Sequence, residues 1–281
     1  MTHLIEKGAS WLKREFLGAA SARQLSRIRK LYELGLTAVT LGRGVPRLIN
    51  GQDRVRISAH HRYVDEIYEP EVFALLKREL SGNGIFFDVG AYIGLYSIIL
   101  SQQLTENGKV YAFEPAPESR KLLERHLKLN GANGKVEVVA AAVGERCGRV
   151  DLFTKDDHIQ NSLARAGLGD VAENCLIKVD MISLDAFCVE RNLSPTWVKI
   201  DTEGWELKVL EGAVGIMSQN PGTRFVVEMH PYAWESAGYD ATAFRKFCAQ
   251  HHLRMKPLTG QKDMYGEYGQ VLVGTNAAIK G

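Results

Sequence analysis

Four acidic residues, Asp88, Glu114, Asp201 and Glu228, lie at or just beyond the ends of predicted strands. These strands alternate with amphipathic helices, a pattern that favours a mostly parallel sheet covered on both faces. The carboxyl ends of such strands meet at one edge of the sheet, where ligands bind near the point at which the strand order reverses. Any one of these acids alone would be better explained as a helix cap or a loop residue. Because there are four, we expect them to converge on one site.

The residues IFFDVGAYIGLYS, at 85–97, predict a strand, a tight turn and a helix. In open α/β sheets such a turn holds a nucleotide-like cofactor. Glu114 ends the next predicted strand, 26 residues after Asp88. An acid at this place commonly accepts hydrogen bonds from both ribose hydroxyls of an adenosine-containing ligand. The sequence therefore predicts an adenosine cofactor.

The turn also distinguishes between adenosine cofactors. A dinucleotide fingerprint needs G-x-G-x-x-G, because its middle glycine lets the backbone approach a pyrophosphate. Here the residue two positions after Gly90 is Tyr92, whose ring obstructs a pyrophosphate, and Asp88 would repel one. The same carboxylate would attract an amine or a sulfonium. The turn thus fits a cationic, phosphate-free adenosine compound, and S-adenosylmethionine is one.

The elements that must position these residues follow from hydrophobic periodicity. Strands are expected over 85–89, 109–115, 135–143, 197–204, 224–231 and 270–275. Helices are expected over about 71–80, 94–104, 119–130 and 241–252, and over WELKVLEGA after residue 204. Residues 148–163 break the alternation and predict a hairpin plus a loop. Residues 1–45 predict two short amphipathic helices, and 46–68 predict short strands around the Asn50-Gly51 turn.

Longer motifs resemble a known family. DVGAYIGLYS, VYAFEPAPESRKLLERHLKLN, AAAVGE, NSL and above all VKIDTEGWELKVLEGA are similar to FkbM-type S-adenosylmethionine-dependent methyltransferases, and they occur in the family's order. The resemblance covers about residues 50–275. It implies a class I methyltransferase with a Rossmann-like, seven-stranded, mostly parallel sheet, helices on both faces and an antiparallel last strand. We expect residues 1–50 to be a short helical N-terminal extension and residues 51–281 to be the methyltransferase domain.

The resemblance also implies roles in cofactor binding. The loop 88–94 would surround the methionine and ribose portions, and Glu114 would accept the ribose diol. Pro115 and Ala142 would lie near the adenine. Tyr96, like Tyr92 of the loop, would face the sulfonium, unless both rings are core residues of the following helix. The expected cofactor-binding set is Asp88, Gly90, Ala91, Tyr92, Gly94, Tyr96, Ser97, Glu114, Pro115, Ala142, Asn161 and Asp201.

Methyl transfer to a hydroxyl requires an aligned acceptor and a group that removes a proton. The candidates are Asp201 and Glu203, beyond the fourth strand, and Glu228 and His230, beyond the fifth. His230 has a near-neutral reference pKa and can act as a base without special tuning, although a lone histidine is more often structural. The same four side chains could instead hold Mg²⁺. Neither segment carries an adjacent Asp-Asp pair, so we do not favour a metal.

Members of the resembled family methylate hydroxyls of sugars, glycans and polyketide-like natural products. We therefore expect O-methylation of a small-molecule or glycan acceptor. Residues that could line its pocket, or equally pack at the surface, are His60, His61, Arg62, Tyr63, Trp205 and Trp234. Two alternatives stay open. An NAD(P)-dependent oxidoreductase or epimerase is disfavoured by Tyr92 and by the lack of a Tyr-x-x-x-Lys pair, and a non-catalytic cofactor-binding homologue would keep the fold without turnover.

Composition sets the broad class. A chain of 281 residues that is 45% hydrophobic and 24% charged is typical of a globular protein, and a net charge of +2 does not argue for nucleic-acid binding. Residues 1–50 carry nine Lys and Arg against three Asp and Glu, so their charge is about +6 and that of the remainder about −4. We expect this basic segment to be a solvated lead-in, a lid over the acceptor pocket, or the interface of a homodimer.

The four cysteines and the hydropathy pattern bear on location. The cysteines are scattered without a C-x-x-C pair, which fits a reducing compartment. No apolar stretch approaches the roughly 20 residues that span a bilayer, and the first residues contain no apolar signal segment. We therefore expect a cytoplasmic protein without a transmembrane segment.

Overall fold

The computed structural model describes residues 22–59, 64–80, 82–154, 162–164 and 176–279. The chain forms two compact units, one of residues 1–68 with 128–130 and the other of residues 69–127 with 131–281. Several sequence predictions lie outside the described residues: those for His60, His61, Arg62, Tyr63 and Asn161, and for the first helix of residues 1–45.

The smaller unit contains a helix followed by a hairpin. Its elements are α2 (Ala22–Val39), β1 (Val45–Ile49) and β2 (Asp53–Ile57), and the two strands pair antiparallel. Asn50 and Gly51 join the strands with φ angles of 49° and 69°, the left-handed values that an Asn-Gly hairpin turn requires. The predicted strands around this turn are confirmed. Leu36 of the helix is buried with Val45 and Ala59, so the end of α2 packs against the hairpin.

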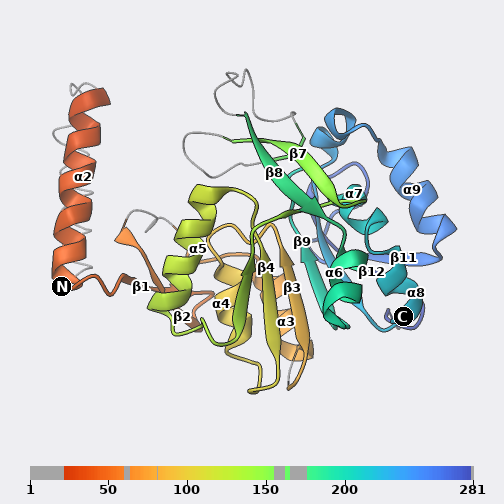
Figure 1. Ribbon diagram of the computed structural model, residues 1–281, viewed down its shortest axis with the longest axis horizontal. Coiled ribbons are helices and arrows are strands. Elements are labelled where there is room, and N and C mark those ends of the chain that lie inside the picture. Colours follow the sequence, from red (N-terminus) through yellow and green to blue (C-terminus); the bar gives the residue numbers. More distant parts are fainter. Residues whose placement is uncertain (1–21, 60–63, 81, 155–161, 165–175, 280–281) are drawn as a thin grey trace. The chain divides into compact units, whose positions relative to one another are not determined.

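A seven-stranded sheet forms the centre of the larger unit (Figure 1). In spatial order its strands are β5 (Val136–Val139), β4 (Lys109–Phe113), β3 (Ile85–Val89), β9 (Trp197–Ile200), β10 (Arg224–Met229), β12 (Gly269–Thr275) and β11 (Leu253–Pro257). Neighbouring strands are parallel from β5 to β10, whereas β12 is antiparallel to both of its neighbours. The predicted mostly parallel sheet with an antiparallel last strand is confirmed.

The order of the strands reverses between β3 and β9. The chain builds β3, β4 and β5 outward on one side and then returns to β9 on the other side of β3. Val89 pairs with Ile200 at the carboxyl ends of β3 and β9. The segments that follow these two residues therefore begin side by side, at the place where open α/β sheets bind ligands.

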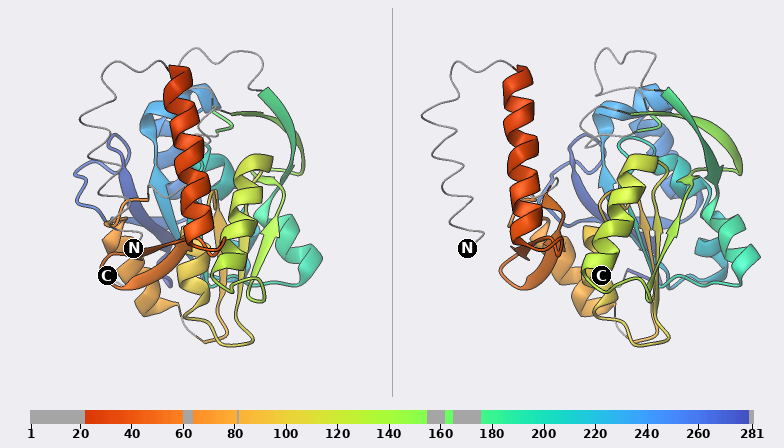
Figure 2. Two further views of the ribbon diagram at one scale, coloured as in Figure 1. Left: turned by 90° about the vertical axis from the view of Figure 1, so that its left-hand side faces the viewer. Right: turned by 60° about the vertical axis from the view of Figure 1, so that its left-hand side comes forward.

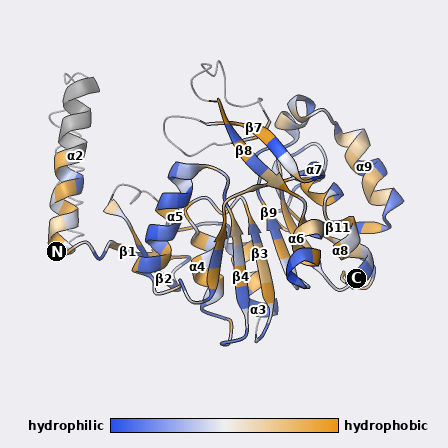
Figure 3. Ribbon diagram, in the orientation of Figure 1, coloured by the Kyte–Doolittle hydropathy of each residue, from blue (hydrophilic) through white to orange (hydrophobic). Residues whose placement is uncertain are grey.

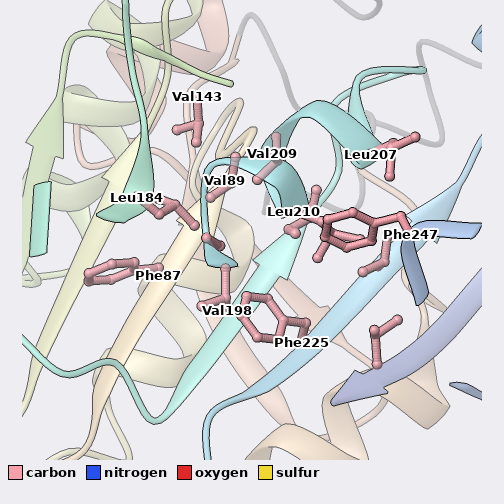
Figure 4. Close-up of a cluster of buried hydrophobic side chains, with 14 of the residues drawn as sticks. Phe87, Val89, Val143, Leu184, Val198, Leu207, Val209, Leu210, Phe225 and Phe247 are labelled. Atoms are coloured by element: carbon pink, nitrogen blue, oxygen red, sulfur yellow. The ribbon is translucent and has the colours of Figure 1, made fainter. Parts of the chain in front are cut away.

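Helices cover both faces of this sheet (Figure 2). Phe87 and Val89 share one apolar core with residues of α6 (Leu184–Arg191), α7 (Glu206–Glu211), α8 (Val214–Gln219) and α9 (Ala241–Gln250) (Figure 4). Successive residues of a strand point to opposite faces, so Phe86 and Asp88 point to the other face. That face carries α4 (Leu95–Ser101), α5 (Pro117–Leu129) and, packed beside α4, α3 (Pro70–Glu79). The central strands are mostly apolar, whereas α5 mixes polar and apolar residues (Figure 3).

Two predictions of local structure were wrong, and one strand was missed. The run at 135–143 is not one strand, because β5 ends at Val139 and β6 (Ala142–Val143) joins a second, three-stranded sheet with β8 (Leu176–Ile182) and β7 (Gly148–Phe153). The run KVEVVAAAV contains no glycine or proline that would reveal where the chain passes from one sheet to another. The segment at 148–163 contains β7, whose partner β8 lies beyond it, and its described residues also form an isolated bridge between Phe153 and Ser162. β11 was not predicted, since LRMKP mixes charged and apolar residues.

The strands expected over 197–204 and 224–231 end earlier, at Ile200 and Met229. The acids that follow β9 therefore lie in a turn before α7. His230 lies between β10 and the short 3₁₀ helix η3 (Pro231–Ala237). Within the described ranges, the chain has no helix long and apolar enough to cross a membrane.

Candidate functional site

The turn after β3 is closed against the strands on either side of it. The backbone N–H groups of Gly90 and Ala91 donate to the carbonyl oxygen of Phe113, at 3.1 and 3.0 Å. Gly90 has a φ of 81°, and a Cβ there would lie 1.8 Å from the carbonyl oxygen of Asp201. Gly94 has a φ of 82°, and a Cβ there would lie 2.2 Å from Leu123 Cδ1. Close packing within the protein therefore requires both glycines, whatever ligand the turn holds.

Asp88 lies beneath this turn and anchors the helix that follows it. The side chain is 1% exposed and accepts hydrogen bonds from Ser97 N at 3.0 Å and Ser97 Oγ at 2.6 Å. Burial raises the pKa of the carboxyl, against the opposing charge of Lys199 and the hydrogen bond from Ser97. The structure thus gives Asp88 and Ser97 a partner in each other, and their direct contact with a cofactor stays a prediction.

Glu114, at the end of β4, is tied to the same turn. One oxygen, Oε2, accepts a hydrogen bond from Tyr92 N at 2.8 Å, and Oε1 accepts one from Ala116 N at 2.9 Å. The side chain is 5% exposed, and burial raises its pKa to about 7 even though both hydrogen bonds lower it. A carboxylate has about four acceptor positions, so about two remain for a ligand. The structure therefore leaves acceptor positions on Glu114 at the edge of the turn, and the contact with a ribose diol stays a prediction.

Two further residues of the predicted cofactor site lie beside Glu114. Pro115 is half-buried, and its carbonyl oxygen accepts a hydrogen bond from Arg120 at 3.0 Å. Ala142 is buried in a small cluster that includes Ala116. The structure therefore brings Pro115 and Ala142 to the loop that Glu114 begins, although nothing in it assigns them to an adenine.

Asp201 follows β9 and faces a buried ammonium group. Its Oδ2 lies 3.0 Å from Nζ of Lys199, which is 2% exposed. Burial acts to raise the pKa of Asp201, but the charges of Lys199 and His230 outweigh it and hold the pKa below its ordinary value. Glu228, at the end of β10, is 5% exposed and accepts a short hydrogen bond from Tyr268. Burial and the charge of Asp201 raise the pKa of Glu228, so the pKa values of these two carboxyls shift in opposite directions.

Tyr96 belongs to the packing between α3 and α4. Its ring stacks on Phe73 with 4.1 Å between ring centroids, and its hydroxyl donates to Glu69 at 2.6 Å. The ammonium of Lys199 lies 4.7 Å from the centroid of the same ring. Of the two readings of Tyr96, the structure favours the core residue, and the ring faces a cation that the protein itself supplies.

His230 lies between two glutamates. Its Nδ1 is 2.9 Å from Oε1 of Glu206, and its Nε2 is 3.6 Å from Oε2 of Glu203. Burial acts to lower the pKa of His230, but the hydrogen bond and charge of Glu206, with the charges of Asp201 and Glu203, raise it to about 10. Burial raises the pKa of Glu203, which also accepts a hydrogen bond from Tyr232 at 3.1 Å. Three of the four predicted catalytic residues therefore meet at one point.

The turn that carries Glu203 is held by Ser162 of the NSL element. Ser162 Oγ donates to the carbonyl oxygen of Glu203 at 2.7 Å and accepts from Ala164 N at 2.9 Å. Trp205 is half-buried against the core, and Trp234 is 1% exposed within it. The suggestion that Trp234 lines an acceptor pocket is therefore wrong, because its ring is buried and its N–H donates to Glu206.

Sequence reasoning missed Glu206 and Lys199. Glu206 is fully buried, and Lys199 lies in the otherwise apolar strand WVKI. A charged residue in a strand buried on both faces needs a partner of opposite charge. That signal was present in the sequence, and it would have pointed from Lys199 to the acid two residues later.

Ligand-type atoms of Asp201, Glu203 and His230 lie within 4.8 Å of one another. A divalent cation takes such oxygen and nitrogen donors. Here Lys199 already supplies a positive charge to Asp201, and His230 is paired with Glu206. We therefore assign no metal to this cluster, and the preference against a metal stays a prediction.

The chain is similar to known methyltransferases. A family model described as "Methyltransferase FkbM domain" matches residues 88–255. The chain is 27% identical over 160 residues to the methyltransferase sdnD of Sordaria araneosa, covering 47% of this chain and 61% of that protein. It is 27% identical over 164 residues to the hexuronic acid methyltransferase AglP of Haloferax volcanii, covering 58% of this chain and 62% of that protein.

The chain thus spans about three fifths of the length of these two relatives. A crystal structure of a methyltransferase FkbM from Methylobacillus flagellatus superimposes with a TM-score of 0.46 and 17% identity, covering 69% of this chain and 44% of that one. The family match includes the turn, Glu114, Asp201 and His230, and it extends over more than half of the chain. The chain belongs to the FkbM methyltransferase domain family.

Proposed function

We propose that this protein is an S-adenosylmethionine-dependent O-methyltransferase that acts on a hydroxyl of a sugar, a glycan or a polyketide-like natural product. The observation that carries the proposal is the histidine between two carboxylates at the ends of β9 and β10. A hydroxyl acceptor must lose a proton as it gains a methyl group, and a histidine so placed can receive it. Family membership supplies the reaction class.

The turn and its acids suit S-adenosylmethionine. The cofactor supplies a methyl group as an electrophile and leaves as S-adenosylhomocysteine. Glu114 has about two free acceptor positions for the ribose hydroxyls. The backbone of Asp201 lies against Gly90 of the turn, and its carboxylate pairs with Lys199. Tyr92 occupies the position where a dinucleotide-binding turn has its middle glycine.

Two exposed tyrosine rings beside His230 bear on the choice of acceptor. Tyr232 and Tyr268 are 56% and 58% exposed, and their hydroxyls bond to Glu203 and Glu228. Both rings lie beside the imidazole of His230, with centroid distances of 5.8 and 5.5 Å. Exposed aromatic faces of this kind stack well on sugar rings and polyketides. The relative named for hexuronic acid also supports a sugar.

Cofactor binding is tested by calorimetric titration of the full chain with S-adenosylmethionine, S-adenosylhomocysteine and NAD. Glu114→Ala should weaken binding of the methyl donor by about ten- to hundred-fold, since it removes charge-assisted hydrogen bonds. Glu118→Ala is the matched control, because Glu118 is an exposed residue that pairs with Lys121; it should bind as the wild type does. Preferred binding of NAD would instead favour the oxidoreductase or epimerase.

Turnover is tested by incubating the protein with methyl-labelled S-adenosylmethionine and a panel of sugars, uronic acids and polyketide alcohols. The expected products are S-adenosylhomocysteine and a methyl ether that survives mild alkali, whereas a carboxyl methyl ester would be hydrolysed. Cofactor binding without transfer to any acceptor would favour the non-catalytic homologue. A homodimer through residues 1–50, one of the roles that the sequence leaves open, is tested by deleting residues 1–45, which should convert a dimer into a monomer in solution.

A further inference from the structure

Glu206 occupies a place that neither its charge nor its helix explains. It is 0% exposed, at the first position of α7. Four groups surround its carboxylate. Gly204 N donates to Oε1 at 2.8 Å, Trp234 Nε1 donates to Oε2 at 2.8 Å, and the Tyr239 hydroxyl lies 3.3 Å from Oε2. The fourth is His230 Nδ1, 2.9 Å from Oε1.

This arrangement decides where the proton of the pair resides. The N–H groups of Gly204 and Trp234 can only donate, and one reaches each oxygen of Glu206. The reference pKa of a histidine lies about 2 units above that of a glutamate, so a shared proton stays on the imidazole. Nδ1 of His230 is therefore a donor to an ionised Glu206, and Nε2 is the nitrogen that can gain or lose a proton.

Nε2, the other ring nitrogen, lies on the side of Glu203. Glu203 Oε2 is 3.6 Å from it, which is beyond a good hydrogen bond. Glu203 is about one third exposed, and the exposed ring of Tyr232 packs edge-on against the imidazole. The two nitrogens of His230 thus face different carboxylates: Nδ1 faces the fully buried Glu206, and Nε2 faces the partly exposed Glu203.

We propose that Glu206 is a positioning residue that holds the proton of His230 on Nδ1 and so leaves Nε2 to take the proton of the acceptor hydroxyl. The inference rests on the proposed function. In the step, the O–H bond of the acceptor breaks and an N–H bond forms at Nε2, while the oxygen gains the methyl group. The resulting imidazolium is stabilised by the buried Glu206, as in other pairs of a histidine and an orienting carboxylate.

The arrangement also sets a direction for the pH dependence. Glu206 of α7, Asp201 and Glu203 of the preceding turn, and burial all act on His230, and the carboxylates prevail in raising its pKa. The rings of Tyr232 and Tyr268 face the same imidazole. Nε2 can accept a proton only when the imidazole of His230 is neutral. The rate of methyl transfer should therefore rise with pH as the imidazole loses its proton, which gives the pH–rate profile an alkaline limb. A neutral residue at 206 should move that limb to lower pH.

Nuclear magnetic resonance of the full chain with ¹⁵N-labelled histidine tests the proton position directly. The chain has eight histidines, and loss of one set of signals in His230→Asn assigns residue 230. We expect Nδ1 to stay protonated across the titration and Nε2 to be the nitrogen that loses its proton. Loss of the Nδ1 proton first would overturn the inference. This titration needs no turnover, so it tests the position of the proton even if the proposed function is wrong.

The kinetic test compares Glu206→Gln with Glu211→Gln, a matched change on the same helix at a residue that pairs with Lys208. Glu206→Gln should lower kcat by about 10²–10⁴-fold with KM for the acceptor nearly unchanged, and should move the alkaline limb down by about one pH unit or more. Glu211→Gln should match the wild type. Tyr239→Phe, which removes one hydroxyl beside Glu206, gives a milder variant if Glu206→Gln does not fold.

The outcomes distinguish a wrong positioning role for Glu206 from a wrong proposed function. If the wild type transfers methyl groups but Glu206→Gln keeps both kcat and the pH profile, the positioning role is wrong and the proposed function stands. A fall in kcat with an unmoved limb would show a merely structural role and would also overturn the inference. If the wild type neither binds nor turns over S-adenosylmethionine, the proposed function fails, and the nitrogen titration still reports the tautomer.

Discussion

Gly90, the first residue of the turn after β3, offers a direct test of how closely this turn approaches Asp201. An alanine at this position would adopt a φ near 81° and would put its Cβ 1.8 Å from the carbonyl oxygen of Asp201. Left-handed backbone costs a non-glycine residue about 1–2 kcal/mol. Relief of an overpacked contact costs a further 1–3 kcal/mol or so. Gly90→Ala should therefore lower the free energy of unfolding by about 2–5 kcal/mol.

Gly238→Ala separates the two contributions. Gly238 has a φ of 82°, almost the same as Gly90, but an added Cβ there would meet nothing within 4 Å. Its substitution should cost only the backbone strain of about 1–2 kcal/mol. The difference between the two variants then measures the contact with Asp201 alone.

Urea unfolding followed by tryptophan fluorescence is the assay. Three of the four tryptophans, Trp197, Trp205 and Trp234, lie in the larger unit, so the signal reports that unit. A lower midpoint with an unchanged slope indicates a change in stability rather than in the denatured state. If Gly90→Ala costs no more than Gly238→Ala, the close approach of the two segments is wrong, and so is our placement of Asp201 beside the turn.

Other predictions concern pH, a helix start and metal. Because the pKa of Glu114 is raised from 4.5 to about 7, its contribution to stability is full below pH 4.5 and is lost as the pH rises through about 7. Between these pH values the free energy of unfolding of the wild type should therefore fall by up to about 3 kcal/mol relative to that of Glu114→Gln, as urea midpoints would show. The same pH dependence of stability in both proteins would contradict this. Asp185→Ala should lower the free energy of unfolding by about 1–2 kcal/mol, since Asp185 accepts hydrogen bonds from Gly215 N and Ile216 N at the start of α8. An unchanged urea midpoint would contradict this. EDTA should leave methyl transfer unchanged, and a loss restored by Mg²⁺ would show that Asp201 and its neighbours hold a metal.

Much of the fold could be predicted from the sequence because it follows from the periodicity of apolar residues and from the residues that form turns. The alternation of apolar strands and amphipathic helices predicted the parallel sheet, and the Asn50-Gly51 pair predicted the hairpin of the smaller unit. Both are local signals. The passage of the chain from β5 to the second sheet at Ala142 was not predictable in this way, because no turn residue separates β5 from β6 in KVEVVAAAV.

The sequence predicted which residues gather at the candidate site better than it predicted the contacts that they make. Acids at the ends of parallel strands must gather at one edge, so Glu114, Asp201 and Glu228 were found by topology alone. Topology does not say which way a side chain turns. Asp88 points to the face that carries α4 and bonds to Ser97 there, because residues at successive strand positions face opposite sides of the sheet.

The spacing of Asp201, Glu203 and Glu206 has a physical reason that the motif alone did not show. Glu203 and Gly204 have φ angles of 52° and 106°, so the backbone turns sharply between β9 and α7. A Cβ on residue 204 would lie 2.5 Å from a side chain of η3, and this close packing lets η3 approach the start of α7. Asp201 therefore stays at the end of β9, facing Lys199, while Glu206 enters the core beneath His230. One residue more or fewer in this turn would rotate Glu206 by about 100° around the helix and separate it from His230, so the spacing itself is what makes the acid an orienting partner.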